Sequence, residues 1–69
     1  MQAGEQVAAQ RLEAALDERR RLSEACERAA GTPAEMASRM RLQASNLQVA
    51  VCERMVNAIR RARRQVADG

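Results

Sequence analysis

Phe, Tyr and Trp are absent from this chain of 69 residues, so any core must be built from Leu, Met, Val, Ile and Ala. His is absent too, which excludes His-based metal ligation and His-based acid/base catalysis. No stretch approaches the ~20 apolar residues of a membrane span, and the N-terminus lacks the basic and apolar segments of a signal peptide. We therefore expect a cytoplasmic protein with no membrane span.

Residues that usually carry catalysis or bind cofactors are equally sparse. The three glycines are isolated, so no Gly-rich loop is available to hold a phosphate. Two cysteines cannot supply the four Cys or His ligands that a structural zinc site usually takes. The sequence predicts a protein that is not an enzyme and has no cofactor, metal or small-molecule substrate.

The residues that are present favour helices. Ala, Arg, Glu, Gln, Leu and Met dominate, and these have the highest helix propensities. The only proline is Pro33, so the pattern has one evident break. We predict an all-α fold of one domain over residues 1–69, a coiled-coil-like antiparallel hairpin with helices at about 5–30 and 33–67 and a turn at 31–32.

Residues 31–35 combine a helix stop with a helix start. Gly31 can adopt the left-handed conformation that ends a helix, because it has no Cβ. Thr32 is expected to cap the second helix, with Pro33 as its first residue. Glu35, three residues after Thr32, is expected to complete a capping box. The chain should therefore reverse direction here.

The two cysteines lie at different levels of such a hairpin. With the turn at 31–32, residues whose numbers sum to about 63 face each other, which separates Cys26 and Cys52 by about 15 residues, or ~22 Å along the axis. A disulfide cannot span this distance. We expect two free thiols in a reducing compartment, packed as small apolar side chains.

The two helices differ in apolar content, with four large apolar residues in the first and ten in the second. One set in the second helix forms a seam suited to a facing helix: Met36, Met40, Ala44, Leu47, Val51, Met55, Ala58 and Ala62. Another set follows a different line: Leu42, Val49, Cys52, Val56, Ile59 and Val66. Between residues 47 and 59 the apolar arc is ~200° wide, whereas a helix with one neighbour needs only ~100° or slightly more.

An apolar arc of this width predicts a partner-binding surface. A hairpin of this size is also too small for a self-sufficient core, so we expect a partner or self-association to complete it. The partner would be another helical protein or a second copy of the chain. The residues predicted to bind it are Leu42, Leu47, Val49, Val51, Cys52, Met55, Val56 and Ile59.

The strongest charge feature is the cluster Arg60, Arg61, Arg63 and Arg64. Arginines can contact phosphates or an acidic partner. A basic last turn is also what the helix dipole favours, and no aromatic residue is present to stack on bases. A homodimeric four-helix bundle that binds RNA or DNA through these arginines is therefore an alternative function.

Four segments resemble small helical-hairpin proteins of bacterial type III secretion systems. RLEAAL at residues 11–16 and RRRL at residues 19–22 resemble the small co-chaperone that, with a larger TPR-like partner, holds the needle subunit in the cytoplasm. TPAEMA at residues 32–37 and MVNAIRR at residues 55–61 resemble needle and inner-rod subunits. Needle subunits usually have a longer turn with proline and aromatic residues in the second helix, and this chain has neither.

The resemblance implies a small chaperone or co-chaperone of a secretion-apparatus subunit, active in protein transport and binding through the apolar face of the second helix. It implies no catalytic residues. A structural needle or inner-rod subunit is the other alternative that it suggests.

Overall fold

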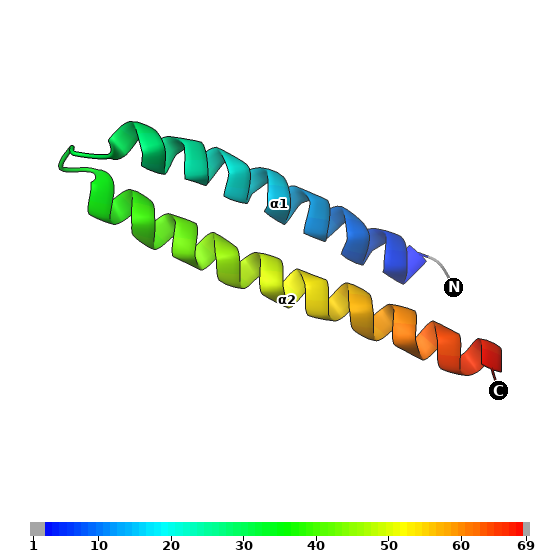
Figure 1. Ribbon diagram of the computed structural model, residues 1–69. Coiled ribbons are helices and arrows are strands. Elements are labelled where there is room, and N and C mark those ends of the chain that lie inside the picture. The colour runs from blue at the N-terminus through cyan, green and yellow to red at the C-terminus, as the bar shows by residue number, and fades with distance from the viewer. Residues whose placement is uncertain (1–2, 69) are drawn as a thin grey trace.

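The computed structural model describes the backbone of residues 3–68 and the side chains of residues 4–66. It consists of two antiparallel helices, α1 (Ala3–Ala29) and α2 (Glu35–Asp68), joined by a short turn (Figure 1). The molecule is a rod with extents of 56 × 15 × 11 Å. The predicted all-α hairpin is confirmed, and the described part of the chain contains no strand.

Gly31 reverses the chain at the end of α1. Its φ angle of 77° lies in the left-handed region, as predicted. The N–H of Thr32 donates to the carbonyl oxygen of Ala29 at 2.9 Å, and the Thr32 hydroxyl donates to the same oxygen at 2.6 Å. These two bonds satisfy a carbonyl that has no partner within the helix.

The start of α2 differs from the predicted capping box. The N–H of Ala34 donates to Thr32 Oγ1 at 3.3 Å, so Thr32 acts as a cap. The carboxylate of Glu35 does not return to the N–H of Thr32, because that group donates to Ala29 and Glu35 Oε1 accepts from Arg39 at 3.0 Å. The N–H of Glu35 donates to the carbonyl oxygen of Thr32 at 3.1 Å, which is a three-residue turn rather than a four-residue α-helical step. The helix α2 accordingly begins at Glu35 rather than at the proline.

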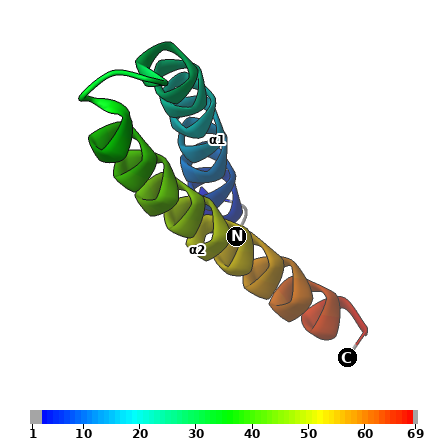
Figure 2. The same cartoon turned by 60° about the vertical axis from the view of Figure 1, so that its left-hand side comes forward.

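The two helices lie side by side and pack through seams with heptad spacing (Figure 2). The α1 seam is Ala8, Leu12, Ala15, Arg19, Leu22 and Cys26, all buried or half-buried. The α2 seam, called the inner seam below, is Leu42, Ser45, Val49, Cys52, Val56 and Ile59, also buried or half-buried. Alternating steps of three and four residues are typical of a left-handed coiled coil.

The buried core is small. Val49, only 1% exposed, clusters with Cys52 and Ala15, and Leu12 packs against this cluster. The alanine of α1 lets the backbones approach closely but contributes little apolar area. A core of this size supplies at most a few kcal/mol, about 3–5 in chains of this length. We therefore expect the isolated hairpin to be marginally stable.

Gly31→Ala should lower the free energy of unfolding by about 1 kcal/mol, because an alanine is strained at a positive φ although nothing lies within 4 Å of its added Cβ. Gly4→Ala is the matched control, since this helical glycine also has nothing within 4 Å, and it should be neutral or slightly stabilising. Urea unfolding followed by circular dichroism measures both. Equal effects of the two substitutions would contradict the assigned turn.

Val49→Ala should lower the free energy of unfolding by about 2 kcal/mol, because it removes two buried methyl groups and leaves a cavity. Val51→Ala, two residues away on the exposed side, should change it by less than about 0.5 kcal/mol. Thermal unfolding of the two variants at equal, low concentration makes the comparison. A larger loss of stability from Val51→Ala than from Val49→Ala would mean that the other side of α2 faces α1.

Candidate partner-binding surface

The structure separates the predicted partner-binding residues into two groups. Leu47 and Val51 are 70% and 52% exposed, and Met55 is exposed as well. The other five belong to the inner seam, where α1 covers them: Leu42, Val49, Cys52, Val56 and Ile59. These five stabilise the hairpin itself, because a side chain buried against α1 offers no area to a partner of the intact hairpin.

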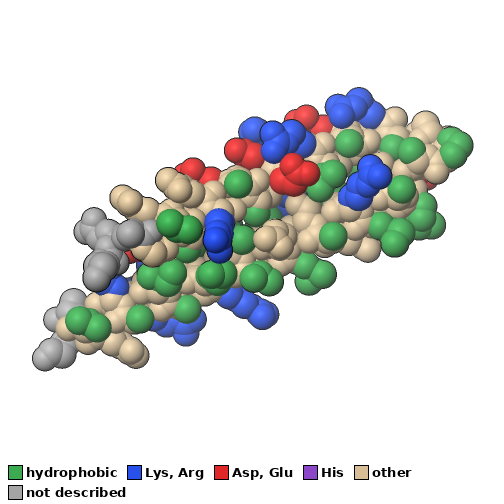
Figure 3. All heavy atoms as spheres, turned by 180° about the vertical axis from the view of Figure 1, so that it is seen from behind, with side chains coloured by type: hydrophobic (Ala, Val, Ile, Leu, Met, Phe, Trp, Pro, Cys, Tyr) green, Lys and Arg blue, Asp and Glu red, His purple; other side chains and the backbone are tan. Residues whose placement is uncertain are grey.

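The exposed apolar residues of α2 form one continuous stripe, called the outer face below. It consists of Met36, Met40, Ala44, Leu47, Val51, Met55, Ala58 and Ala62, all of which are exposed. At about 100° per residue these positions lie on the side of α2 that points away from α1. Figure 3 shows hydrophobic side chains along the length of α2, the lower helix in that view.

Met36 and Met40 are part of this surface, although the predicted binding set omits them. They are 68% and 64% exposed, among the largest exposures of any apolar side chain described. The signal that could have found them is spacing, since the outer face advances in steps of four, four and three residues from Met36 to Ala62. Methionine is flexible and polarisable, which suits a surface that must fit another protein.

A shallow groove between the helices adjoins the outer face. Its lining residues are Ala15, Glu18, Leu22, Arg41, Ala44, Ser45 and Gln48. Ala44 belongs to both the groove and the outer face, so the apolar surface continues from α2 towards α1. A helix laid against the outer face could therefore also contact this groove.

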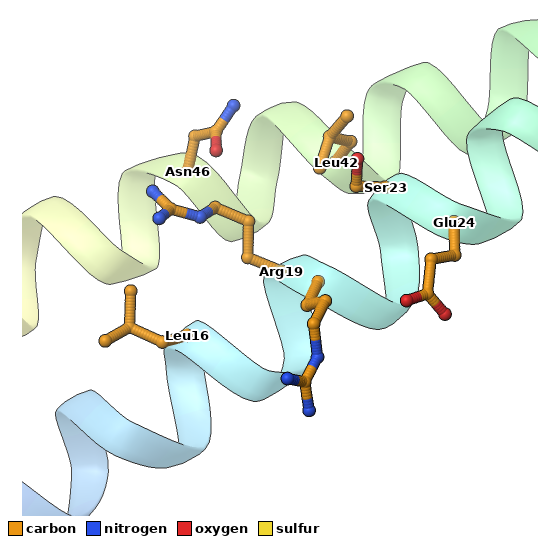
Figure 4. Close-up of a pocket in the computed structure, with 7 residues that line it drawn as sticks. Leu16, Arg19, Ser23, Glu24, Leu42 and Asn46 are labelled. Atoms are coloured by element: carbon orange, nitrogen blue, oxygen red, sulfur yellow. The ribbon is translucent and has the colours of Figure 1, made fainter.

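The opposite side of the hairpin is polar. A hollow there is lined by Leu16, Arg19, Arg20, Ser23, Glu24, Leu42 and Asn46. Arg19, which interrupts the apolar seam of α1, is half-buried and extends towards Asn46 of α2 (Figure 4). The hollow is open and holds one carboxylate beside two guanidinium groups, so it offers no acid/base pair.

Two of the four arginines in the cluster near the C-terminus pair with a carboxylate of α1. Arg60 Nε lies 3.5 Å from one Glu5 oxygen, and Arg63 Nη1 lies 2.5 Å from the other. The Glu5 side chain is 17% exposed, so this clasp between the two helices is partly shielded from water. Arg61 and Arg64 are exposed.

Both cysteines lie on the packed side of their helices. Cys26 is half-buried and Cys52 is buried, both as free thiols. Among the residues that the structure describes, no three His, Cys, Asp or Glu side chains gather as metal ligands. Within the same residues, neither helix is apolar over a length sufficient to cross a lipid bilayer.

Comparison with known proteins returns no match to a protein-family model, to a curated protein or to a solved structure.

Glu5→Gln should lower the free energy of unfolding by about 0.5–1 kcal/mol in low salt and by much less in high salt, because it removes the charge that holds Arg60 and Arg63. Glu13→Gln removes the same charge from an exposed position of α1 and serves as the control. Thermal unfolding at two salt concentrations compares them. Equal losses from the two variants would rule out a stabilising clasp.

Proposed function

We propose that this chain is a non-enzymatic interaction module that binds another helical protein through the outer face of α2. The observation that carries the proposal is the exposure of a stripe of eight apolar residues along a helix whose other side is already covered by α1. Contiguous apolar surface of this kind marks interaction sites. A bound helix would also bury further apolar area, which would add to the small stabilisation that the core supplies.

In its most concrete form, the module is a small cytoplasmic chaperone or co-chaperone of a type III secretion subunit. The resemblance of residues 11–16 and 19–22 to such co-chaperones supports this form. The mechanism would be burial of the outer face against a larger helical partner. The chain and this partner would together keep an assembly subunit from polymerising early.

The nucleic-acid alternative has weaker support. Arg60 and Arg63 pair with Glu5, which leaves Arg61 and Arg64 for phosphates. Phosphate affinity grows with the number of arginines that remain available to bind.

Selection of binders from a displayed library of amphipathic helical peptides tests the proposal. Leu47→Glu combined with Val51→Glu should lower the affinity of the chain for the selected peptides at least about tenfold, because the bound peptide would bury two charges. Asn46→Glu combined with Asn57→Glu adds the same charges to exposed positions on the polar side and should change affinity by less than about twofold.

Two results would contradict the proposal: a library that yields no binder, or equal losses of affinity from the two double variants. Light scattering of the purified chain over a range of concentrations separates the remaining forms. A stable dimer would favour the four-helix bundle, and fibres would favour a needle or inner-rod subunit. A poorly folded chain that gains helix content on binding would favour the co-chaperone.

A further inference from the structure

The outer face of α2 is bordered by positive charge. Arg54 and Arg61, seven residues apart, lie along one border, and Arg41 lies along the other, where it lines the groove next to α1. All three are exposed, and none forms an ion pair with another described side chain. In Figure 3, blue side chains lie at the edges of the hydrophobic surface.

Acidic side chains near this surface are already engaged or point elsewhere. Glu18 of α1 lines the same groove as Arg41 but pairs with Arg21 at 3.2 Å. Glu35 of α2 pairs with Arg39. Glu53 lines a hollow with Leu16 on the polar side of the hairpin. The border of the outer face therefore has a local excess of positive charge.

This charge pattern argues against a second copy of the chain as the occupant. Two parallel copies in contact through their outer faces would pair the Arg41 border of one copy with the Arg54 and Arg61 border of the other, so both edges of the contact would be positively charged. Two antiparallel copies would pair like borders, so that Arg54 and Arg61 of one copy would share an edge of the interface with Arg54 and Arg61 of the other. Like charges across an interface are unfavourable, whereas opposite charges select the partner.

The pattern of side-chain sizes favours a helix over a lipid surface. Ala44 lies between Met40 and Leu47 on the stripe, and Ala58 and Ala62 follow Met55 at its C-terminal end. Small residues between large ones create the holes into which side chains of a facing helix can insert. Binding to a lipid surface depends mainly on apolar area and gains nothing from a hole of this kind.

We infer that the outer face binds an amphipathic helix from another protein, whose apolar stripe is bordered by Asp and Glu. The inference rests on the proposed function and adds the charge of the partner. Arg41, Arg54 and Arg61 select the acidic borders, and the stripe between them supplies the apolar contact.

Two synthetic helical peptides test this inference. They share one stripe of Leu and Ala at steps of four, four and three residues, and differ only in having Glu or Lys on both borders. Fluorescence anisotropy of a labelled peptide gives the dissociation constant in low and high salt. The Glu peptide should bind at least about tenfold more tightly in low salt, and the difference should shrink in high salt.

Substitution of the border arginines should remove the discrimination. The triple variant Arg41→Gln, Arg54→Gln and Arg61→Gln should bind the two peptides within about twofold of each other. The matched control Arg20→Gln, Arg28→Gln and Arg64→Gln makes the same change in net charge at exposed positions away from the border and should keep the preference.

Three outcomes would overturn the inference: equal binding of the two peptides, no binding of the Glu peptide, or preference for anionic phosphatidylserine vesicles over that peptide. If both peptides bind equally but Leu47→Glu with Val51→Glu abolishes binding, the proposed function survives and only the charge selection fails. If the library selection also yields no binder through the outer face, the proposed function fails as well.

Discussion

The contact of Val49 and Cys52 with Ala15 and Leu12 is the interaction on which the rest of the structure depends. It fixes which side of α2 faces α1, since the residues of the inner seam recur at heptad spacing from Leu42 to Ile59 and are all buried or half-buried. Once this side is fixed, the second apolar stripe of α2 must point outwards. The exposed outer face is thus a direct consequence of how the small core is packed.

The two apolar surfaces of α2 have different roles. The inner seam and the clasp between Glu5 and the two arginines hold the hairpin together. The outer face adds nothing to that stability, yet it contains most of the large exposed apolar side chains. A chain with so small a core gains much from a partner that covers this face, because binding to the folded state alone shifts the folding equilibrium.

The fold could be predicted from Gly31 and the helical periodicity, because these are local signals. The orientation of α2 was harder to predict, because the inner seam and the outer face are both apolar. The buried Ser45 also places a polar residue within the inner seam, which weakens its hydrophobic pattern. Step length distinguishes them: heptad steps match the seam of α1, whereas steps of four, four and three residues follow an ~11-residue repeat that drifts away from it. The clasp at Glu5 depends on the register, which is set by a turn longer than the two residues predicted.

Thiol labelling tests most directly whether α2 has one covered side and one open side. Two variants, each with one thiol, are compared at low protein concentration: Cys26→Ser, which keeps the native Cys52, and Cys26→Ser with Cys52→Ser and Val51→Cys, which has a thiol on the outer face. The native thiol of Cys52 should react on the order of a hundredfold more slowly than the introduced thiol, because reaction of Cys52 requires the hairpin to open. Adding a helical peptide that binds the outer face should slow the reaction of the introduced thiol. Equal rates for the two thiols in the folded chain would contradict the packing on which both proposals depend.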